Sequence, residues 1–195
     1  MRNAEINRKT NETDIALKLE IDGQGKSSVD TGVGFFDHMM CLFASHGKFN
    51  VNLKCRGDTW VDAHHSCEDI GIALGDAFSK ALGEKRGIKR YADIILPMDE
   101  ALVMCAVDIS GRAHLSYDVP TPTEKIGTFD CELSREFFEA FVRSSGITLH
   151  IKKLDGANSH HIIEGVFKAF ARVMRSACSV DERYENEIPS TKGVL

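Results

Sequence analysis

The chain has 195 residues, of which 43% are hydrophobic and 27% are charged, the composition of an ordinary globular protein. A formal net charge of -5 argues against a general affinity for nucleic acid, and no apolar run reaches the roughly 20 residues of a membrane span. The six cysteines form no CxxC pair, and the N-terminus MRNAEINRKTNETD lacks the apolar stretch of a secretory signal. We therefore expect free thiols and a cytoplasmic location.

The first half of the chain contains two segments with helical apolar spacing among stretches that alternate between apolar and polar residues. Alternation indicates a half-buried strand, whereas apolar residues three and four apart indicate one face of a helix. Glycine after a helical segment and aspartate before one indicate helix ends. We expect, in chain order, a strand at 13–21, turns at Gly23, Gly25, Gly32 and Gly34, a helix at 35–47, a strand at 49–55, and a helix from about Ala63 to Leu82 capped by Asp62.

The second half has the same kinds of segment. Two prolines, Pro120 and Pro122, predict a loop at 120–132, and the C-terminal residues after the last helix are polar and irregular. We expect strands at about 92–96, 101–108 and 113–119, that loop, a helix capped by Ser134 and ending at Gly146, a strand at 147–154, and a last helix from about Ser159 to Ala177.

The order of elements repeats, and each repeat ends in a long helix that opens with His-His-x-x-Glu. The motif reads HHSCE at 64–68 and HHIIE at 160–164. We therefore predict an α+β fold of two duplicated βββαβα halves, 1–90 and 91–195, within one compact domain. Each half would place its helices on one face of a mixed sheet, and the helices of the two halves would be buried against each other.

The motif separates its side chains in a way that suggests two metal ions. Residues four apart share one face of a helix, whereas adjacent residues diverge by about 100°. One ion could not use all three side chains of a motif, but two ions could use both motifs if the helix starts lie side by side. A single HHxxE is more often a polar helix start, and its duplication is what favours metal. The predicted ligand sets are His160, Glu164 and His65 for one ion, and His64, Glu68 and His161 for the other.

Two imidazoles and one carboxylate leave each ion with open positions. His38 and Glu136 precede the two motifs at matching positions, and they are the candidate fourth ligands. Imidazole and carboxylate without thiolate suit manganese, iron, cobalt or zinc, and open octahedral positions favour manganese or ferrous iron. Asp37, beside His38, is either an acceptor that orients an imidazole or an ordinary capping residue.

Six segments in chain order, spanning nearly the whole chain, carry a resemblance to a known family: RKTNETDI (8–15), GVGFFDHMM (32–40), DAHHSCEDIGIALGDA (62–77), DISGRAHLSYD (108–118), GITLHIKKLDGANSHHIIEGVFKAFARVMR (146–175) and PSTKG (189–193). Through these segments the chain resembles the imidazoleglycerol-phosphate dehydratases. No phosphatase domain is appended, so we expect a monofunctional member.

The resemblance implies both a fold and an assembly. It implies helices sandwiched between two four-stranded sheets, two Mn²⁺ ions per active site, and a homo-oligomer of 24 subunits with active sites between subunits. One position departs from the family, in which many members have His where this chain has Glu136. A carboxylate can bind metal there, and a water molecule or His150 are the alternatives.

The resemblance also implies the reaction. D-erythro-imidazoleglycerol phosphate loses water and becomes imidazole acetol phosphate, a step of histidine biosynthesis. The proton to be removed has no neighbouring carbonyl to acidify it. With both ring nitrogens on metal, the ring would become an imidazolate that expels hydroxide and gives a diazafulvene, after which an enol forms and tautomerises to the ketone.

Further residues acquire roles only through the resemblance. Glu12 matches a substrate-contacting glutamate and is the candidate acid and base. Arginine forks suit phosphate oxygens. The candidate phosphate-binding residues are Arg90, Arg112, Lys168, Ser190, Thr191 and Lys192. Without the resemblance, Glu12 and each of these residues would be interpreted as a solvated surface residue.

Two other functions compete with the dehydratase. A dinuclear metallohydrolase would use the same ligands, and would usually add a carboxylate that bridges both ions. A non-enzymatic module for metal storage or RNA binding is the second alternative, because halves of this shape occur in ribosomal proteins and fold does not determine function. The acidic balance and the lack of a basic aromatic face argue against RNA.

Overall fold

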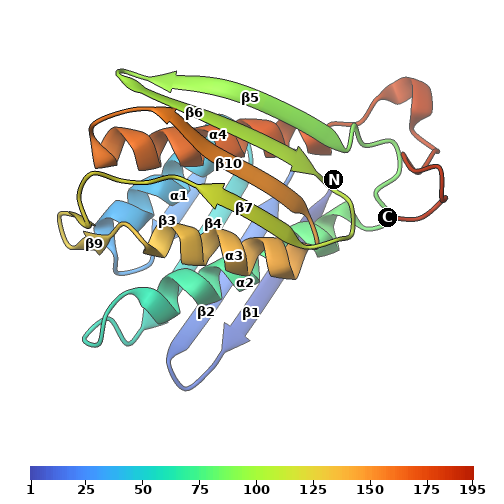
Figure 1. Cartoon of the computed structure of the whole chain (residues 1–195). Coiled ribbons are helices and arrows are strands. Elements are labelled where there is room, and N and C mark those ends of the chain that lie inside the picture. Colours follow the sequence, from blue (N-terminus) through green and yellow to red (C-terminus); the bar gives the residue numbers. More distant parts are fainter.

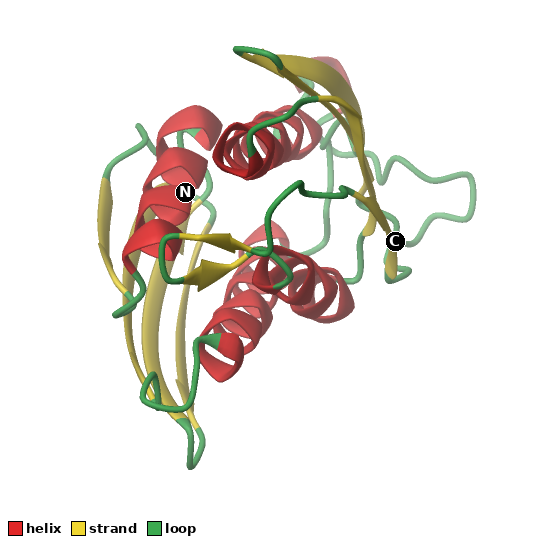
Figure 2. Cartoon of the chain, turned by 60° about the vertical axis from the view of Figure 1, so that its left-hand side comes forward, coloured by secondary structure: helices red, strands yellow, loops and turns green.

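Four helices fill the space between two four-stranded sheets in the computed structural model, which describes residues 1–195 (Figure 1). The sheets have strand orders β1-β2-β4-β3 and β5-β6-β10-β7. In both sheets the first two neighbouring pairs are antiparallel and the third is parallel, so the topologies are the same. Figure 2, turned from that view, shows the helices lying between the two sheets.

The two halves contribute their elements in the same order, which confirms the predicted duplicated βββαβα fold. The boundary between residues 90 and 91 remains a prediction. The first half contains β1 (Asn3–Lys9), β2 (Thr13–Glu20), β3 (Ser27–Asp30), α1 (Gly34–Gly47), β4 (Asn50–Gly57) and α2 (His64–Leu82). The second contains β5 (Tyr91–Met98), β6 (Ala101–Asp108), β7 (His114–Asp118), β8 (Lys125–Ile126), β9 (Phe129–Asp130), α3 (Leu133–Ser145), β10 (Thr148–Asp155), α4 (Ser159–Cys178) and the 3₁₀ turn η1 (Glu182–Tyr184).

Phenylalanine rings join the helices of both halves into one core. Each helix contributes one ring to a closed circuit, and all four rings are fully buried. Rings at these separations attract one another in addition to burying apolar area. The centroid distances are 6.0 Å for Phe43–Phe78, 5.7 Å for Phe78–Phe141, 5.1 Å for Phe141–Phe170 and 5.4 Å for Phe170–Phe43.

None of the four helices is both long enough and apolar enough to cross a membrane.

The helices pack in two pairs, α1 with α4 and α2 with α3. Two glycines let α2 approach α3 closely. A Cβ atom on Gly71 would lie 2.6 Å from the carbonyl oxygen of Phe137, and one on Gly75 would lie 2.6 Å from that of Phe141. The contact positions rise together along both helices, so α2 and α3 run in the same direction. The start of the shorter helix α3 therefore lies beside the start of α2, and in the other pair His38 near the start of α1 lies beside Glu164 near the start of α4.

Several local predictions were wrong. β1 forms where no strand was predicted, and β3 forms in a stretch where only turns were predicted. Both segments are short and polar, so their alternation of apolar and polar residues is too weak to be recognised. The predicted loop at 120–132 contains the β8–β9 hairpin. Ser134 lies inside α3 and its hydroxyl contacts the Tyr117 hydroxyl, so it is not the cap. For Asp37, by contrast, the structure favours one of the two predicted alternatives, the capping residue, because its carboxylate accepts from the Thr31 amide at 2.8 Å and contacts the Thr31 hydroxyl just before α1.

Candidate active site

Polar side chains anchor the start of both helices that carry the motif. The Asp62 carboxylate accepts from the His64 amide at 2.8 Å, which agrees with the predicted capping role although the helix begins at His64. The Asn158 side chain, which the sequence interpretation missed, accepts from the amides of His160 and His161 at 2.9 and 3.2 Å. These bonds satisfy helix-start amides and hold both pairs of imidazoles at the first turn.

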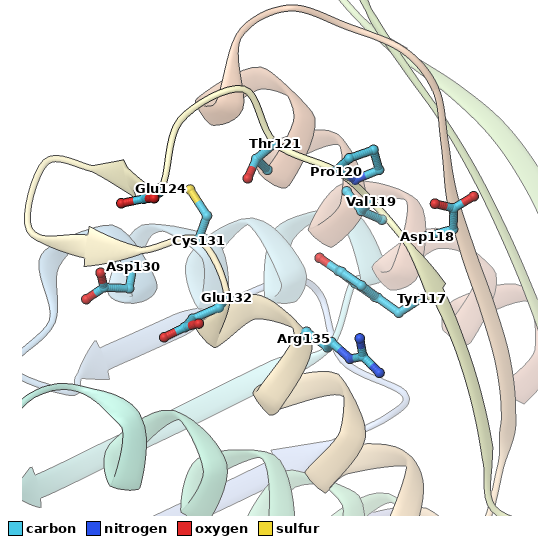
Figure 3. Close-up of a pocket in the computed structure, with 10 residues that line it drawn as sticks. All are labelled: Tyr117, Asp118, Val119, Pro120, Thr121, Glu124, Asp130, Cys131, Glu132 and Arg135. Carbon is cyan, nitrogen blue, oxygen red and sulfur yellow. The ribbon is translucent and has the colours of Figure 1, made fainter.

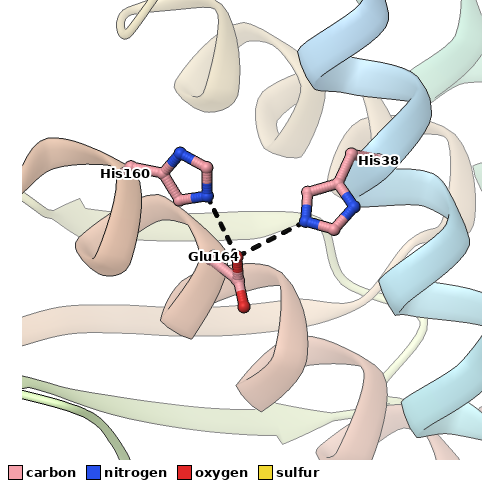
Figure 4. Close-up of side chains that lie close together, drawn as sticks. All are labelled: His38, His160 and Glu164. Atoms are coloured by element: carbon pink, nitrogen blue, oxygen red, sulfur yellow. Dashed lines mark hydrogen bonds and ion pairs between the residues drawn. The ribbon is translucent and has the colours of Figure 1, made fainter.

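The second motif is gathered into a cluster of possible metal ligands (Figure 4). The His160 Nε2 atom lies 3.1 Å from a carboxylate oxygen of Glu164, and the His38 Nε2 atom lies 3.5 Å from the same oxygen. Ligand atoms of the three residues all lie within 4.8 Å of one another, and this is the single group of three His, Cys, Asp or Glu residues so arranged in the chain. The pairing of α1 with α4 thus brings the predicted fourth ligand His38 to a predicted His/Glu pair.

Glu164 is the buried member of this cluster. Its other carboxylate oxygen is 2.5 Å from the Lys168 ammonium, one turn further along α4. Burial raises the pKa of the Glu164 carboxyl, but the hydrogen bond and charge of Lys168, with the hydrogen bonds of His160 and His38, outweigh it and hold that pKa below its usual value. Glu164 is therefore an anionic ligand candidate.

The first motif is not gathered in the same way within one chain. Glu68 forms an ion pair with Arg143 of α3 at 2.9 Å, and the predicted His64–Glu68 pair is not formed. Glu136 lies in the first turn of α3, which packs on α2, much as His38 lies near the start of α1, which packs on α4. His150, the alternative ligand, lies on β10 with its ring 5.6 Å from that of His114 and outside the cluster.

The second imidazole of each motif points to a different carboxylate. The His65 Nδ1 atom is 3.0 Å from Asp58, and the His161 Nδ1 atom is 2.7 Å from Glu100. These hydrogen bonds raise the pKa of both imidazoles, and the bond to His161 lowers the pKa of Glu100 to about 2. Neither imidazole joins the His38 cluster. The predicted sharing of ligands between the two motifs is therefore not formed within a single chain.

Acidic side chains also lie near the outer nitrogen of these two imidazoles. The His65 Nε2 atom is 3.7 Å from Glu12, and the His161 Nε2 atom is 3.7 Å from Asp99. Glu12 is exposed in the turn between β1 and β2, beside the first motif, as a residue that exchanges protons with substrate would be. Glu100, which the sequence interpretation missed, follows Asp99 in the equivalent turn of the second half, and comparing the two halves residue by residue could have found it.

Most of the candidate phosphate-binding residues gather at one place. The buried Arg90 guanidinium donates to Asp108 at 2.7 and 3.2 Å and to the carbonyl oxygen of Pro189 at 2.7 Å. Arg112, which is largely exposed, approaches the same Asp108 carboxylate at 3.8 Å. Arg90 thus anchors the segment that begins at Pro189 and carries Ser190, Thr191 and Lys192. Arg112 is the more exposed of the two arginines, and its guanidinium donates to the carbonyl oxygen of Ser110 at 3.3 Å.

The phosphate-binding candidates and the His38 cluster lie at opposite ends of α4. The Arg90 amide donates to the carbonyl oxygen of Ala177 near the end of that helix, whereas His160 lies in its first turn. At 1.5 Å per residue the two positions are about 25 Å apart. Lys168 stands apart from the other candidates, because it lies beside Glu164. A small phosphate ester cannot reach from one group to the other within one chain.

A cavity of about 530 Å³ lies between β7, the β8–β9 hairpin and α3, but its lining does not suit a phosphate or a metal bound by histidines (Figure 3). Four carboxylates line it against one guanidinium, so it would repel a phosphate. It also contains no histidine. Its lining residues are Tyr117, Asp118, Val119, Pro120, Thr121, Glu124, Asp130, Cys131, Glu132 and Arg135.

The two-layered repeat, with an imidazole–carboxylate cluster at the start of one motif-bearing helix, defines the class as an α+β protein built by internal duplication, with a candidate metal centre. The sequence model of the family described as imidazoleglycerol-phosphate dehydratase matches residues 31–174. The chain belongs to this family.

Individual relatives match over the full chain. The imidazoleglycerol-phosphate dehydratase of Oceanobacillus iheyensis is 56% identical over 195 residues, covering 100% of both chains, and that of Prochlorococcus marinus (strain AS9601) is 55% identical, covering 100% of this chain and 97% of the relative. The crystal structure of the Staphylococcus aureus enzyme has a TM-score of 0.84 at 38% identity and covers 92% of this chain and 99% of that one. The Pyrococcus furiosus structure has a TM-score of 0.85 at 36% identity and covers 97% and 100%.

These similarities confirm the predicted family and reaction. The chain is an imidazoleglycerol-phosphate dehydratase, a hydro-lyase of histidine biosynthesis. No observation favours the dinuclear metallohydrolase that competed with it, and the same matches leave the non-enzymatic module without support.

Proposed function

We propose that this dehydratase uses two Mn²⁺ ions per active site, held by imidazole and carboxylate ligands from both motifs. The donor set supports this proposal. Two ligand atoms about 2.1 Å from one octahedral ion and at right angles to each other lie about 3 Å apart. The His160 and Glu164 ligand atoms are 3.1 Å apart, and His38 Nε2 is 3.5 Å from the same oxygen. This separation and the nitrogen and oxygen donors fit manganese.

We assign the ligands of one ion to His38, His160 and Glu164, completed by His65 of a second copy of the chain. The other ion would be held by His64, Glu68 and Glu136, completed by His161 of a second copy. The Arg143 guanidinium, which pairs with Glu68 in the structure, would then move away from Glu68 when the ion binds. Bound Mn²⁺ would act as a Lewis acid on the two imidazole nitrogens of the substrate.

The separation along α4 is the observation that carries the assembly part of the proposal. The His38 cluster and the Arg90–Arg112 group are about 25 Å apart in one chain, so one copy cannot supply both to a small substrate. We therefore place the active site between subunits, in the assembly of 24 that the family resemblance implies. Arg112, Ser190, Thr191 and Lys192 of one copy would bind the phosphate, while Lys168 of another approaches it from the metal cluster.

Within that site the remaining task is proton transfer. Glu12 lies 3.7 Å from the outer nitrogen of His65, so a carboxylate stands beside a proposed ligand. We assign Glu12 to removing the proton from the carbon next to the one that loses hydroxyl. Arg90 acts indirectly, because its guanidinium is occupied by Asp108 and Pro189. Its role is to hold the segment that carries Ser190 to Lys192. We retain the proposal of a cytoplasmic location.

The test is metal analysis of the purified protein combined with an assay on imidazoleglycerol phosphate. We expect two Mn²⁺ per chain in the assembled enzyme, and loss of ketone formation on chelation with recovery on adding Mn²⁺. Full dehydratase activity in protein free of divalent metal would refute the metal part of the proposal. Activity in an isolated monomer would refute the shared site.

A further inference from the structure

Two carboxylates outside the proposed ligand sets bind the second imidazole of each motif. Asp58 places both carboxylate oxygens, at 3.0 and 3.2 Å, against Nδ1 of His65, and Glu100 places one oxygen 2.7 Å from Nδ1 of His161. The same ring atom is engaged in both halves. In each case Nε2 makes no hydrogen bond, although Glu12 and Asp99 lie 3.7 Å from the Nε2 atoms of His65 and His161.

A carboxylate at Nδ1 determines which nitrogen can bind a metal. A neutral imidazole carries its proton on one ring nitrogen and a lone pair on the other. A carboxylate only accepts, so the Nδ1 atom beside it must carry the proton and donate it. The lone pair is then held on Nε2, which is the form that binds a metal ion through that atom.

The two halves reach this contact by different routes. Asp58 directly follows β4, and the residue that directly follows β10 at the equivalent position is Gly156, which has no side chain. In the second half Glu100 makes the contact instead, from the turn between β5 and β6. The equivalent turn of the first half carries Glu12, which lies on the Nε2 side of its imidazole. A contact preserved by residues at non-equivalent positions points to a requirement at Nδ1 and not to inheritance from the duplication.

We propose that Asp58 and Glu100 are positioning residues that hold His65 and His161 in the Nδ1–H form, so that both Nε2 atoms are ready for Mn²⁺. This inference rests on the proposed metal function, and it extends that function to two carboxylates that would not themselves touch the metal. Loss of such an acceptor typically weakens metal binding by about 10-fold to 100-fold.

The surroundings of the two carboxylates differ, and the difference provides a sharp test. Glu100 uses its other oxygen to accept from the amides of Ala157 and Asn158 at 3.3 and 2.9 Å. In a Glu100→Gln variant the amide oxygen would stay with those two N–H groups, so the NH₂ group would face His161 and force Nδ1 to accept. The side-chain oxygens of Asp58 bind only His65. In Asp58→Asn the amide oxygen can therefore turn to Nδ1 and preserve the proton there.

The experiment is titration of chelator-treated full-length protein with Mn²⁺, with free Mn²⁺ followed by electron paramagnetic resonance. We expect Kd to rise about 10-fold to 100-fold at one class of sites in Glu100→Gln and in Asp58→Ala, and to stay within a few-fold of wild type in Asp58→Asn. The control is Glu139→Gln, an exposed carboxylate on α3 that pairs only with Arg135. Thermal unfolding without metal checks that each variant folds.

The outcomes separate the two levels of the proposal. Unchanged Mn²⁺ affinity in a folded Glu100→Gln protein, or equal losses in Asp58→Asn and Asp58→Ala, would overturn the positioning role. A wild-type protein that binds no Mn²⁺ would instead overturn the proposed metal function. Selective loss in Glu100→Gln and Asp58→Ala, with Asp58→Asn and Glu139→Gln near wild type, supports both.

Discussion

Glu164 combines the features of a metal ligand more completely than any other residue of the chain. Its side chain is buried, and one carboxylate oxygen lies close to the Nε2 atoms of both His160 and His38. The other carboxylate oxygen forms an ion pair with Lys168. Because its pKa in the folded protein is depressed, its contribution to stability is present above the unfolded pKa of about 4.3 and is lost as the pH falls through the lower folded value. The negative charge is thus available throughout the neutral range, where a cation would bind.

Replacing His160 with alanine should remove one of the two proposed metal sites. We expect about one Mn²⁺ fewer per chain and near-complete loss of turnover, because both imidazole nitrogens of the substrate need a metal in the proposed mechanism. Metal content by elemental analysis and ketone formation measure the two effects. His114→Ala, at an exposed position on β7, is the control and should retain both. A His160→Ala protein that keeps full activity with one ion would contradict the two-metal mechanism.

Replacing Glu12 with glutamine should separate chemistry from binding. The change keeps the shape of the side chain and removes its basicity, so we expect kcat to fall by about 10²–10⁴-fold while metal content and thermal stability stay unchanged. Steady-state kinetics with the phosphate substrate give the answer. A change confined to KM would make Glu12 a binding residue instead.

At the scale of elements, the pairing of helices decides which ligands meet. α1 lies along α4 and brings His38 to the second motif, while α2 lies along α3 and brings Glu136 beside the first. Gly71 and Gly75 permit the second pairing, because the carbonyl oxygens of α3 lie where Cβ atoms would otherwise be. The approach of the two helices is therefore set by backbone contact.

Gly75→Ala should loosen this helix pair. The added Cβ would lie 2.6 Å from the Phe141 carbonyl oxygen and 3.0 Å from the Ser145 nitrogen, both backbone atoms that cannot move independently. We expect a loss of about 1–3 kcal/mol in the free energy of unfolding, measured by denaturant titration. Gly34→Ala at the start of α1 meets no atom within 4 Å and should be neutral or slightly stabilising. Equal effects of the two changes would argue against close packing of α2 on α3.

At the scale of the molecule, the two ends of α4 lie beside the two residue groups of the proposed site, the His38 cluster and the Arg90–Arg112 group. The Phe43–Phe78–Phe141–Phe170 circuit joins all four helices, so the halves cannot rearrange to bring those ends together without opening the core. In the proposed site, another copy of the chain would supply what each end lacks. Activity and assembly are therefore expected to depend on each other.

Stripping metal should test this dependence. Imidazole ligands must be unprotonated to bind, so chelator or acid should release Mn²⁺. If the ions join residues of different copies, we expect the large particle to dissociate into smaller species and to re-form when Mn²⁺ is restored at neutral pH. Light scattering before and after chelation measures the size. A particle of unchanged size with all metal removed would show that assembly does not depend on the ions.

The duplicated fold and both motifs were predictable from the chain alone, because apolar periodicity and the repeated HHxxE are local properties. His38 was recognised as a ligand candidate by its position in the repeat. The segments that resemble the dehydratase family predicted the reaction. Periodicity was too weak to reveal β1, β3 or the β8–β9 hairpin, where few side chains in each segment are buried.

The partners of the motif residues depended on packing between distant segments, which no local pattern records. Folding joins His38 to Glu164 through the α1–α4 pair, turns His65 to Asp58 and His161 to Glu100, and ties Arg90 to Asp108 and Pro189. The predicted sharing of ligands across the two motifs is not formed in one chain, because each motif-bearing helix packs on a shorter helix of the other half and the two motifs do not meet. The separation of the phosphate-binding residues from the His38 cluster follows from the length of α4, whose rigid backbone keeps its two ends apart.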